Sequence, residues 1–135
     1  MKRLALIHTV DWYQSVITKP FFNALLDKYP NFEIMNILDS TLLSDSLKAG
    51  YATDEILHRI VGYALLAQTA GADMVMCSCT TVNKAMQLAR ESGKFHIPAL
   101  NIDEPMIEKA IEAGSKFGIV ATLETSPQGT CYLLE

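Results

Sequence analysis

Short, unbroken apolar runs alternate along this chain with longer segments of helical character. Leu4 to Ile7 is the first such run, and it ends at His8 and Thr9. A run without polar interruption is typical of a strand that is buried on both faces of a sheet. We expect further strands over residues 32–38, 73–77, 97–102 and 117–121.

The segments between these runs have sequence patterns that are typical of helices. We expect helices from Thr18 or Pro20 to Lys28 and over residues 53–71, 80–93, 103–114 and 126–135. Residues 39–53 are polar and rich in Ser and Thr, so a loop with at most one helical turn is expected there. Strands that alternate with helices form βαβ units. The sequence therefore predicts an α/β fold with a parallel sheet, a three-layer arrangement of the flavodoxin or Rossmann type.

Composition excludes several classes of function. The net charge is −4 and charges of both signs are scattered, so neither nucleic acid nor an anionic membrane surface is an expected partner. No apolar segment is long enough to cross a membrane, and the run behind Met1-Lys2-Arg3 is too short for a signal peptide. Three cysteines do not build a disulfide framework, which favours a cytoplasmic location. Their spacing also predicts no metal site.

Polar residues gather where the predicted strands end. These positions are His8-Thr9, Asp39-Ser40-Thr41, Cys79-Thr80-Thr81 and residues 122–125, which include Thr122 and Thr125. Ligands of open parallel sheets bind outside the carboxyl ends of the strands. A rim of hydroxyl groups near helix N-termini suits a small carboxylate or phosphate. The chain lacks the glycine-rich motifs of nucleotide sites, so no cofactor is expected.

Cys79 is the candidate reactive residue of this rim. A helix N-terminus lowers the pKa of a nearby thiol, and a thiolate can act as a base or a nucleophile. The alternative is an inert, buried cysteine, a common fate of free thiols. Cys77 lies inside the predicted strand, where packing in the core is expected. His8 has two open interpretations, since it could orient a substrate or serve as a hydrogen-bonded structural residue.

Two stretches resemble the aspartate/glutamate racemase superfamily. They are GADMVMCSCTTV (residues 71–82) and IPALNIDEPMIEKAIEAGSKFGIVATLETS (residues 97–126), in the order and spacing of that family. The resemblance implies cofactor-independent racemases or isomerases of small carboxylic acids. In these enzymes two α/β domains enclose the substrate, and each supplies a cysteine that faces the α-carbon. Cys79 would be the first base.

The resemblance also implies which residues bind the substrate. Thr80, Thr81, Thr122 and Thr125 would hold the carboxylate, and His8 and Thr9 complete the predicted rim. The second cysteine of the family lies beyond the matched part. Cys131 does not take its place, because it falls in a predicted helix and not in a turn after a strand.

The resemblance also predicts how the chain divides into domains, and it leaves alternatives for the function. Residues 1–100 would form the first α/β domain, and residues 101–135 would begin a second, truncated one. A cut second domain leaves strand edges without neighbours, so a homodimer or higher self-association is expected. The alternatives to a racemase or isomerase are a protein that binds small carboxylates without turnover and an inactive fragment.

Overall fold

A four-stranded parallel sheet forms the centre of the protein. The computed structural model describes residues 1–13, 15–16 and 19–134. The strands are β1 (Lys2–His8), β2 (Phe32–Leu38), β3 (Met74–Cys77) and β4 (Ala99–Asn101), in the order β2-β1-β3-β4. Leu6 of β1 pairs with Asn36 of β2 on one side and with Met76 of β3 on the other. The predicted α/β fold with a parallel sheet is confirmed.

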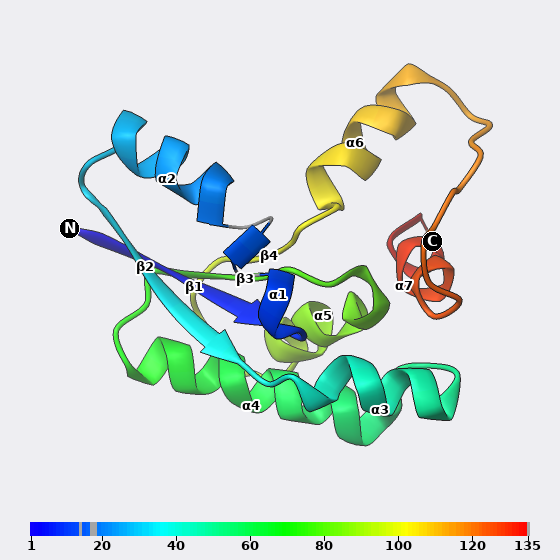
Figure 1. Ribbon diagram of the computed structural model, residues 1–135, viewed down its shortest axis with the longest axis horizontal. Coiled ribbons are helices and arrows are strands. Elements are labelled where there is room, and N and C mark those ends of the chain that lie inside the picture. Colours follow the sequence, from blue (N-terminus) through cyan, green and yellow to red (C-terminus); the bar gives the residue numbers. More distant parts are fainter. Residues whose placement is uncertain (14, 17–18, 135) are drawn as a thin grey trace.

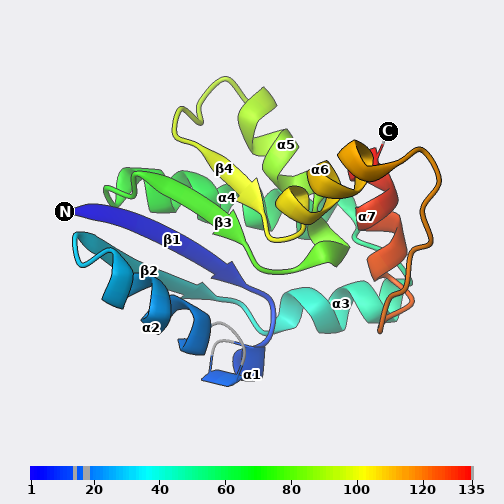
Figure 2. The ribbon, with the colours of Figure 1, turned by 90° about the horizontal axis from the view of Figure 1, so that it is seen from above.

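Helices cover both faces of this sheet. Figure 1 shows α2 (Lys19–Lys28) and α6 (Glu104–Ala113) on one side, with α4 (Asp54–Thr69) and α5 (Lys84–Glu91) on the other. The short α1 (Asp11–Tyr13) follows β1, and α3 (Thr41–Ala49) follows β2. The last helix, α7 (Ser126–Leu134), lies off the carboxyl end of the sheet (Figure 2). This end is where the sequence predicts the candidate functional residues.

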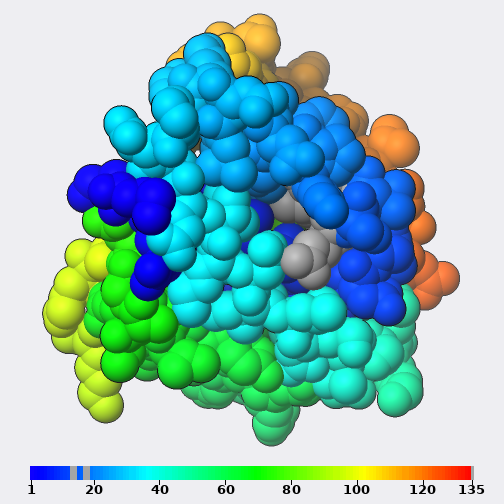
Figure 3. Space-filling view, turned by 60° about the vertical axis from the view of Figure 1, so that its left-hand side comes forward, coloured from blue at the N-terminus to red at the C-terminus, as the bar shows by residue number. Residues whose placement is uncertain are grey.

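β2 forms one edge of the sheet. Figure 3 shows it in cyan at the surface, with α2 above it and α3 and α4 below. The side chains of Asn36 and Leu38 are exposed there. At the opposite edge, β4 pairs only with β3 among the described strands.

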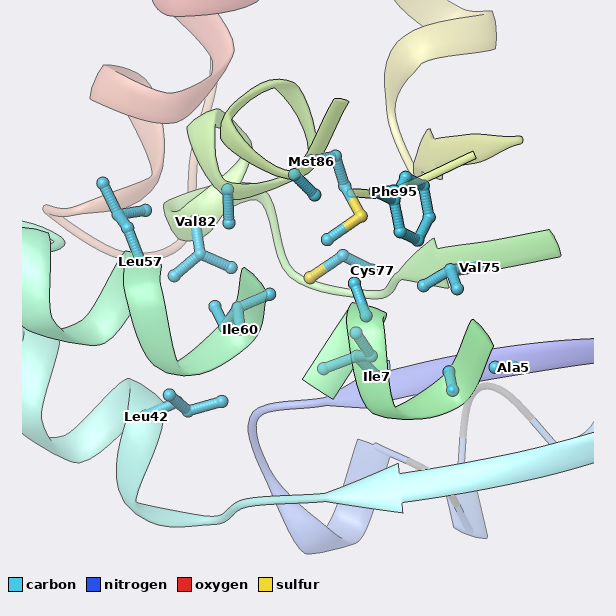
Figure 4. Packing of buried hydrophobic residues seen from close by; sticks show 14 of the residues in the cluster. Ala5, Ile7, Leu42, Leu57, Ile60, Val75, Cys77, Val82, Met86 and Phe95 are labelled. Carbon is cyan, nitrogen blue, oxygen red and sulfur yellow. The ribbon is translucent and has the colours of Figure 1, made fainter. Parts of the chain in front are cut away.

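The main core lies between the sheet and the α4/α5 layer. Strand residues meet helix residues there, as Figure 4 shows for Ala5, Ile7, Val75, Cys77, Ile60 and Met86. Alternate residues of a strand point to the same face, which is why Ala5 and Ile7, and likewise Val75 and Cys77, enter this core together. Cys77 has no exposed surface, so its predicted packing role is confirmed.

α4 begins and ends as its sequence predicts. The Thr53 hydroxyl accepts a hydrogen bond from the Ile56 amide at 3.4 Å, which satisfies one of the free N–H groups of the first turn. Gly71 follows the helix with a φ of 83°, a conformation that glycine adopts without strain.

The prediction of a loop over residues 39–53 is wrong, because nine of these residues form α3. Asp39 accepts a hydrogen bond from the Thr41 amide at 3.0 Å, and Gly50 ends the helix with a φ of 82°. Leu42 and Ser46, four residues apart, form the buried face. Ser46 is tolerated there because its hydroxyl donates to the Leu42 carbonyl at 2.9 Å.

The predicted strand over residues 117–121 is also absent. The chain leaves α6 at Gly114 and passes outside the sheet, as the orange segment of Figure 1 shows. Val120 is 99% exposed. An apolar run becomes a strand only where a neighbour accepts its hydrogen bonds, and this segment does not reach β4.

Smaller differences concern the ends of elements. The helix predicted after Cys79 starts with a turn of 3₁₀ helix, η2 (Thr80–Val82), before α5. β4 is shorter than residues 97–102. Thr18, one predicted start of α2, and Glu135, the predicted end of α7, lie outside the described residues. Within the described part of the chain, no helix is both long and apolar enough to span a membrane.

Candidate functional site

The carboxyl ends of β1 and β3 bring the first candidate residues together. Ile7 of β1 pairs with Cys77 of β3, and the Ser78 amide donates to the Ile7 carbonyl at 3.0 Å. His8 and Thr9 on one strand therefore lie beside Ser78 and Cys79 on the other.

Cys79 and Cys77 have different environments. Cys79 is in extended conformation immediately before η2, and its side chain is half-buried against the edge of the core. Cys77 is enclosed by the core, and this burial raises the pKa of its thiol to about 12. Cys77 therefore stays protonated at neutral pH. Of the two thiols, Cys79 is the one that solvent or a ligand can reach.

Two of the predicted threonines contact each other. Thr81 Oγ1 lies 3.1 Å from Thr125 Oγ1 and 3.4 Å from Ser126 Oγ, and all three side chains are buried. The pair links η2 to the start of α7, although 44 positions separate the two threonines in sequence. These hydroxyls hold two elements together.

Thr80 and Thr122 line a common pocket. The pocket has a volume of about 420 Å³ and lies between α6, residues 117–122 and α7. Its polar lining consists of Thr80, Asp103, Thr122, Ser126 and Thr130. Thr80 immediately follows Cys79, so the half-buried thiol lies next in the chain to this pocket.

His8 is buried and both of its ring nitrogens have partners. Nδ1 lies 3.0 Å from Ser78 Oγ, and Nε2 lies 2.9 Å from Asn36 Oδ1. Burial lowers the pKa of His8, so the neutral ring is favoured. The Ser78 hydroxyl also donates to the Ile7 carbonyl at 3.1 Å, so His8 and Ser78 belong to one buried hydrogen-bond network. This geometry fits the structural interpretation of His8. Thr9 is likewise buried.

A second polar cluster was missed by the sequence analysis. Asn83 Nδ2 donates to Asp103 Oδ2 at 2.9 Å and to the Gly129 carbonyl at 3.1 Å, and Asn101 Nδ2 donates to the Asn83 carbonyl at 3.1 Å. Asp103 is the N-cap residue of α6, but its side chain makes no capping hydrogen bond. Instead it accepts from Asn83. The rule that points to strand ends also applies to β4 and could have found Asn101 and Asp103.

Comparisons with known proteins agree with the fold. The sequence model of the family described as Asp/Glu/Hydantoin racemase matches residues 17–132. Among curated proteins, no match was found. Among solved structures, glutamate racemase from Aquifex pyrophilus superposes with a TM-score of 0.64 at 16% sequence identity. The superposition covers 97% of this chain and 51% of that protein, so the chain spans about half of its length.

Proposed function

Because the chain belongs to the Asp/Glu/Hydantoin racemase family, we propose that it supplies the thiol base of an amino-acid racemase or isomerase. The observation that carries the proposal is the position of Cys79. It follows a central strand, it is half-buried, and it directly precedes a threonine that lines the pocket. A thiolate there would take the α-proton of a small carboxylic acid, breaking the Cα–H bond and forming S–H.

The negative charge that this step leaves on the substrate must be stabilised by hydrogen-bond donors. The electron pair of the broken Cα–H bond delocalises onto the substrate carboxylate, so hydrogen bonds to that carboxylate become stronger as the reaction proceeds. Thr80 and Thr122 are the proposed donors, since both line the pocket. Thr81 and Thr125 are proposed to act indirectly, by fixing η2 against α7. His8 and Thr9 would support the loop behind Cys79.

Solvent exchange at the α-carbon tests the proposal. The protein is incubated with candidate amino acids in D₂O, and loss of the α-proton signal is followed by NMR. Cys79→Ala should slow the exchange by about 100-fold or more, the contribution typical of a general base. Cys131→Ser, which changes an exposed thiol on α7, is the matched control and should leave the rate unchanged.

Two outcomes would contradict this assignment. If exchange persists in Cys79→Ala, another group is the base. If the wild-type protein binds a small carboxylate without any exchange, the chain is a binding protein and not a catalyst.

A further inference from the structure

Asp103 is a buried carboxylate without a cation. Its side chain is 6% exposed, and Oδ2 accepts from Asn83 at 2.9 Å and from Thr130 at 3.4 Å. Oδ1 is buried with no donor among the described residues. Within the same part of the chain, no Lys or Arg forms an ion pair with it. A buried carboxylate oxygen without a donor is costly, so a partner that donates a hydrogen bond and carries positive charge suits this site.

In the cluster around Asp103, the side-chain amides have acceptor oxygens without a partner but no unused hydrogens. Both hydrogens of the Asn83 amide group are used, towards Asp103 and Gly129, and both hydrogens of the Asn101 amide group are used, towards Asn83 and Glu104. Asn83 Oδ1 and Asn101 Oδ1 are buried without partners, as is Asp103 Oδ1. A group that completes this cluster must therefore donate hydrogen bonds, and an anion is excluded.

Asp103 is the one charged residue among the described residues that line the pocket, and most of the lining is apolar. The apolar part is formed by Met106, Ile107, Ala110, Ile119, Val120 and Leu134, among others. No Lys or Arg is found among the described residues that line the pocket. A second carboxylate on a ligand would find no cation there and would be repelled by Asp103. The volume of about 420 Å³ is in the range of small-molecule sites.

We propose that this pocket binds an α-amino acid with an apolar side chain and that Asp103 receives its ammonium group. The ammonium supplies the hydrogen-bond donor and the positive charge that Asp103 lacks. The hydroxyls of Thr80 and Thr122 face the carboxylate, and the side chain lies against Met106 and Ile107. The assignment of this ligand as a substrate rests on the proposed function, but the binding site does not.

A matched pair of probes tests the site. L-norleucine and hexanoate share one carbon skeleton and differ in the amine, and L-glutamate adds a second carboxylate. Titration of the 135-residue chain, followed by NMR or calorimetry, should give norleucine an affinity at least about tenfold above that of hexanoate and of glutamate. Shifts of the Met106 and Ile107 methyl signals should accompany norleucine binding.

A pair of variants tests whether the negative charge of Asp103 itself is needed for binding, and a third variant tests the apolar part of the pocket. Asp103→Asn removes the charge with little change in shape and should weaken norleucine binding by about tenfold or more. Glu108→Gln makes the same change of charge on the exposed face of α6, outside the pocket, and should change the affinity by less than about twofold. Ala110→Phe fills the apolar part and should weaken norleucine as well, which keeps a test available if Asp103→Asn does not fold.

The opposite results overturn the proposal. Equal affinity for norleucine and hexanoate would mean that the free oxygens hold only water, and tighter binding of glutamate would exclude an apolar-side-chain specificity. Norleucine binding without α-proton exchange would support this site and contradict the proposed function. Exchange that depends on Cys79 but requires no amine on the acid would contradict this site and support the proposed function.

Discussion

Gly129 of α7 contacts Thr80 so closely that a Cβ atom at position 129 would lie 1.8 Å from the Thr80 carbonyl oxygen. The same residue accepts, through its carbonyl, a hydrogen bond from Asn83. Glycine at this position thus allows α7 to pack on the turn that follows Cys79. The seating of α7 in turn brings Ser126 and Thr130 to the pocket.

Gly129→Ala should therefore destabilise the protein although alanine is the better helix former. The added methyl group meets backbone atoms that cannot move aside independently, and overpacking of this kind costs about 1–3 kcal/mol or more. Gly62→Ala in α4 is the matched control, because a Cβ atom there meets nothing within 4 Å. That variant should gain about 0.5–1 kcal/mol. Urea unfolding measures both, and equal effects of the two substitutions would contradict the close packing of α7.

The Thr81–Thr125 pair gives a second prediction. Thr81→Val keeps the shape of the side chain but leaves the Thr125 hydroxyl buried with its partner removed, which should cost about 1–2 kcal/mol in the free energy of unfolding. The double variant with Thr125→Val should cost less than the sum of the two single changes, because no orphaned hydroxyl remains in the pair. A double-mutant cycle in urea measures this coupling, and strict additivity would show that the two hydroxyls act independently.

Sequence patterns predicted the parts of this structure that depend on local order. α4 follows its Thr53 and Gly71 signals, since both depend on residues close in sequence. Residues 32–38 form a strand as expected, because β1 lies beside them as a pairing partner. The apolar run at residues 117–121 gave a wrong prediction, because strand formation depends on a neighbour far away in the chain. The helix Thr41–Ala49 was not predicted, because its buried face is short and includes a serine.

The candidate site was predictable to a similar extent. The strand-end rule placed Cys79, Thr80 and Thr81 at one edge of the sheet, and the structure brings Thr122 and Thr125 to the same region. The strand-end rule could not predict which hydroxyls would form hydrogen bonds with each other and which would line a pocket, since that depends on how α7 packs. The free oxygen of Asp103 also escapes any sequence pattern, because it follows from an excess of acceptors over donors in three dimensions.

The three thiols should react at different rates with a reagent such as DTNB. Cys131 is exposed, Cys79 is half-buried and Cys77 is buried with its pKa raised to about 12. We expect Cys131 to react first, Cys79 more slowly, and Cys77 only after unfolding, because a protonated thiol in the core is neither nucleophilic nor accessible. Cys131→Ser should remove the fastest phase and Cys79→Ala the intermediate one. Reaction of Cys77 in the folded protein would contradict its place in the core.

The protein is also expected to form dimers or larger assemblies. Val120, Phe117 and Ile119 present apolar surface to solvent, and β4 pairs on one side only among the described strands. Burial of such surface between two copies would be favourable. Sedimentation velocity should show dimers or larger species at high protein concentration, and Val120→Asp should shift them towards the monomer. A wild-type monomer across the whole concentration range would contradict this expectation.

Asp39 makes stability depend on acid pH. Partial burial alone would raise the pKa of Asp39, but hydrogen bonds from Thr41, Tyr63 and Arg59 outweigh it and lower the pKa to about 2, against 3.8 for the free side chain. The folded state therefore prefers the ionised carboxylate. This preference stabilises the fold by about 2 kcal/mol above pH 4, and the stabilisation is lost as the pH falls through about 2.

Asp39→Asn tests this contribution. The difference in unfolding free energy between the wild type and the variant should be largest from pH 5 to 7 and should shrink as the pH falls towards 2 and below, because protonation of Asp39 then makes the group at position 39 neutral in the wild type as well. Urea unfolding at constant ionic strength gives the two curves. A difference that stays constant from pH 7 to pH 2 would mean that the ionised carboxylate gains nothing from Arg59, Tyr63 and Thr41, and that the effect of the substitution is one of shape alone.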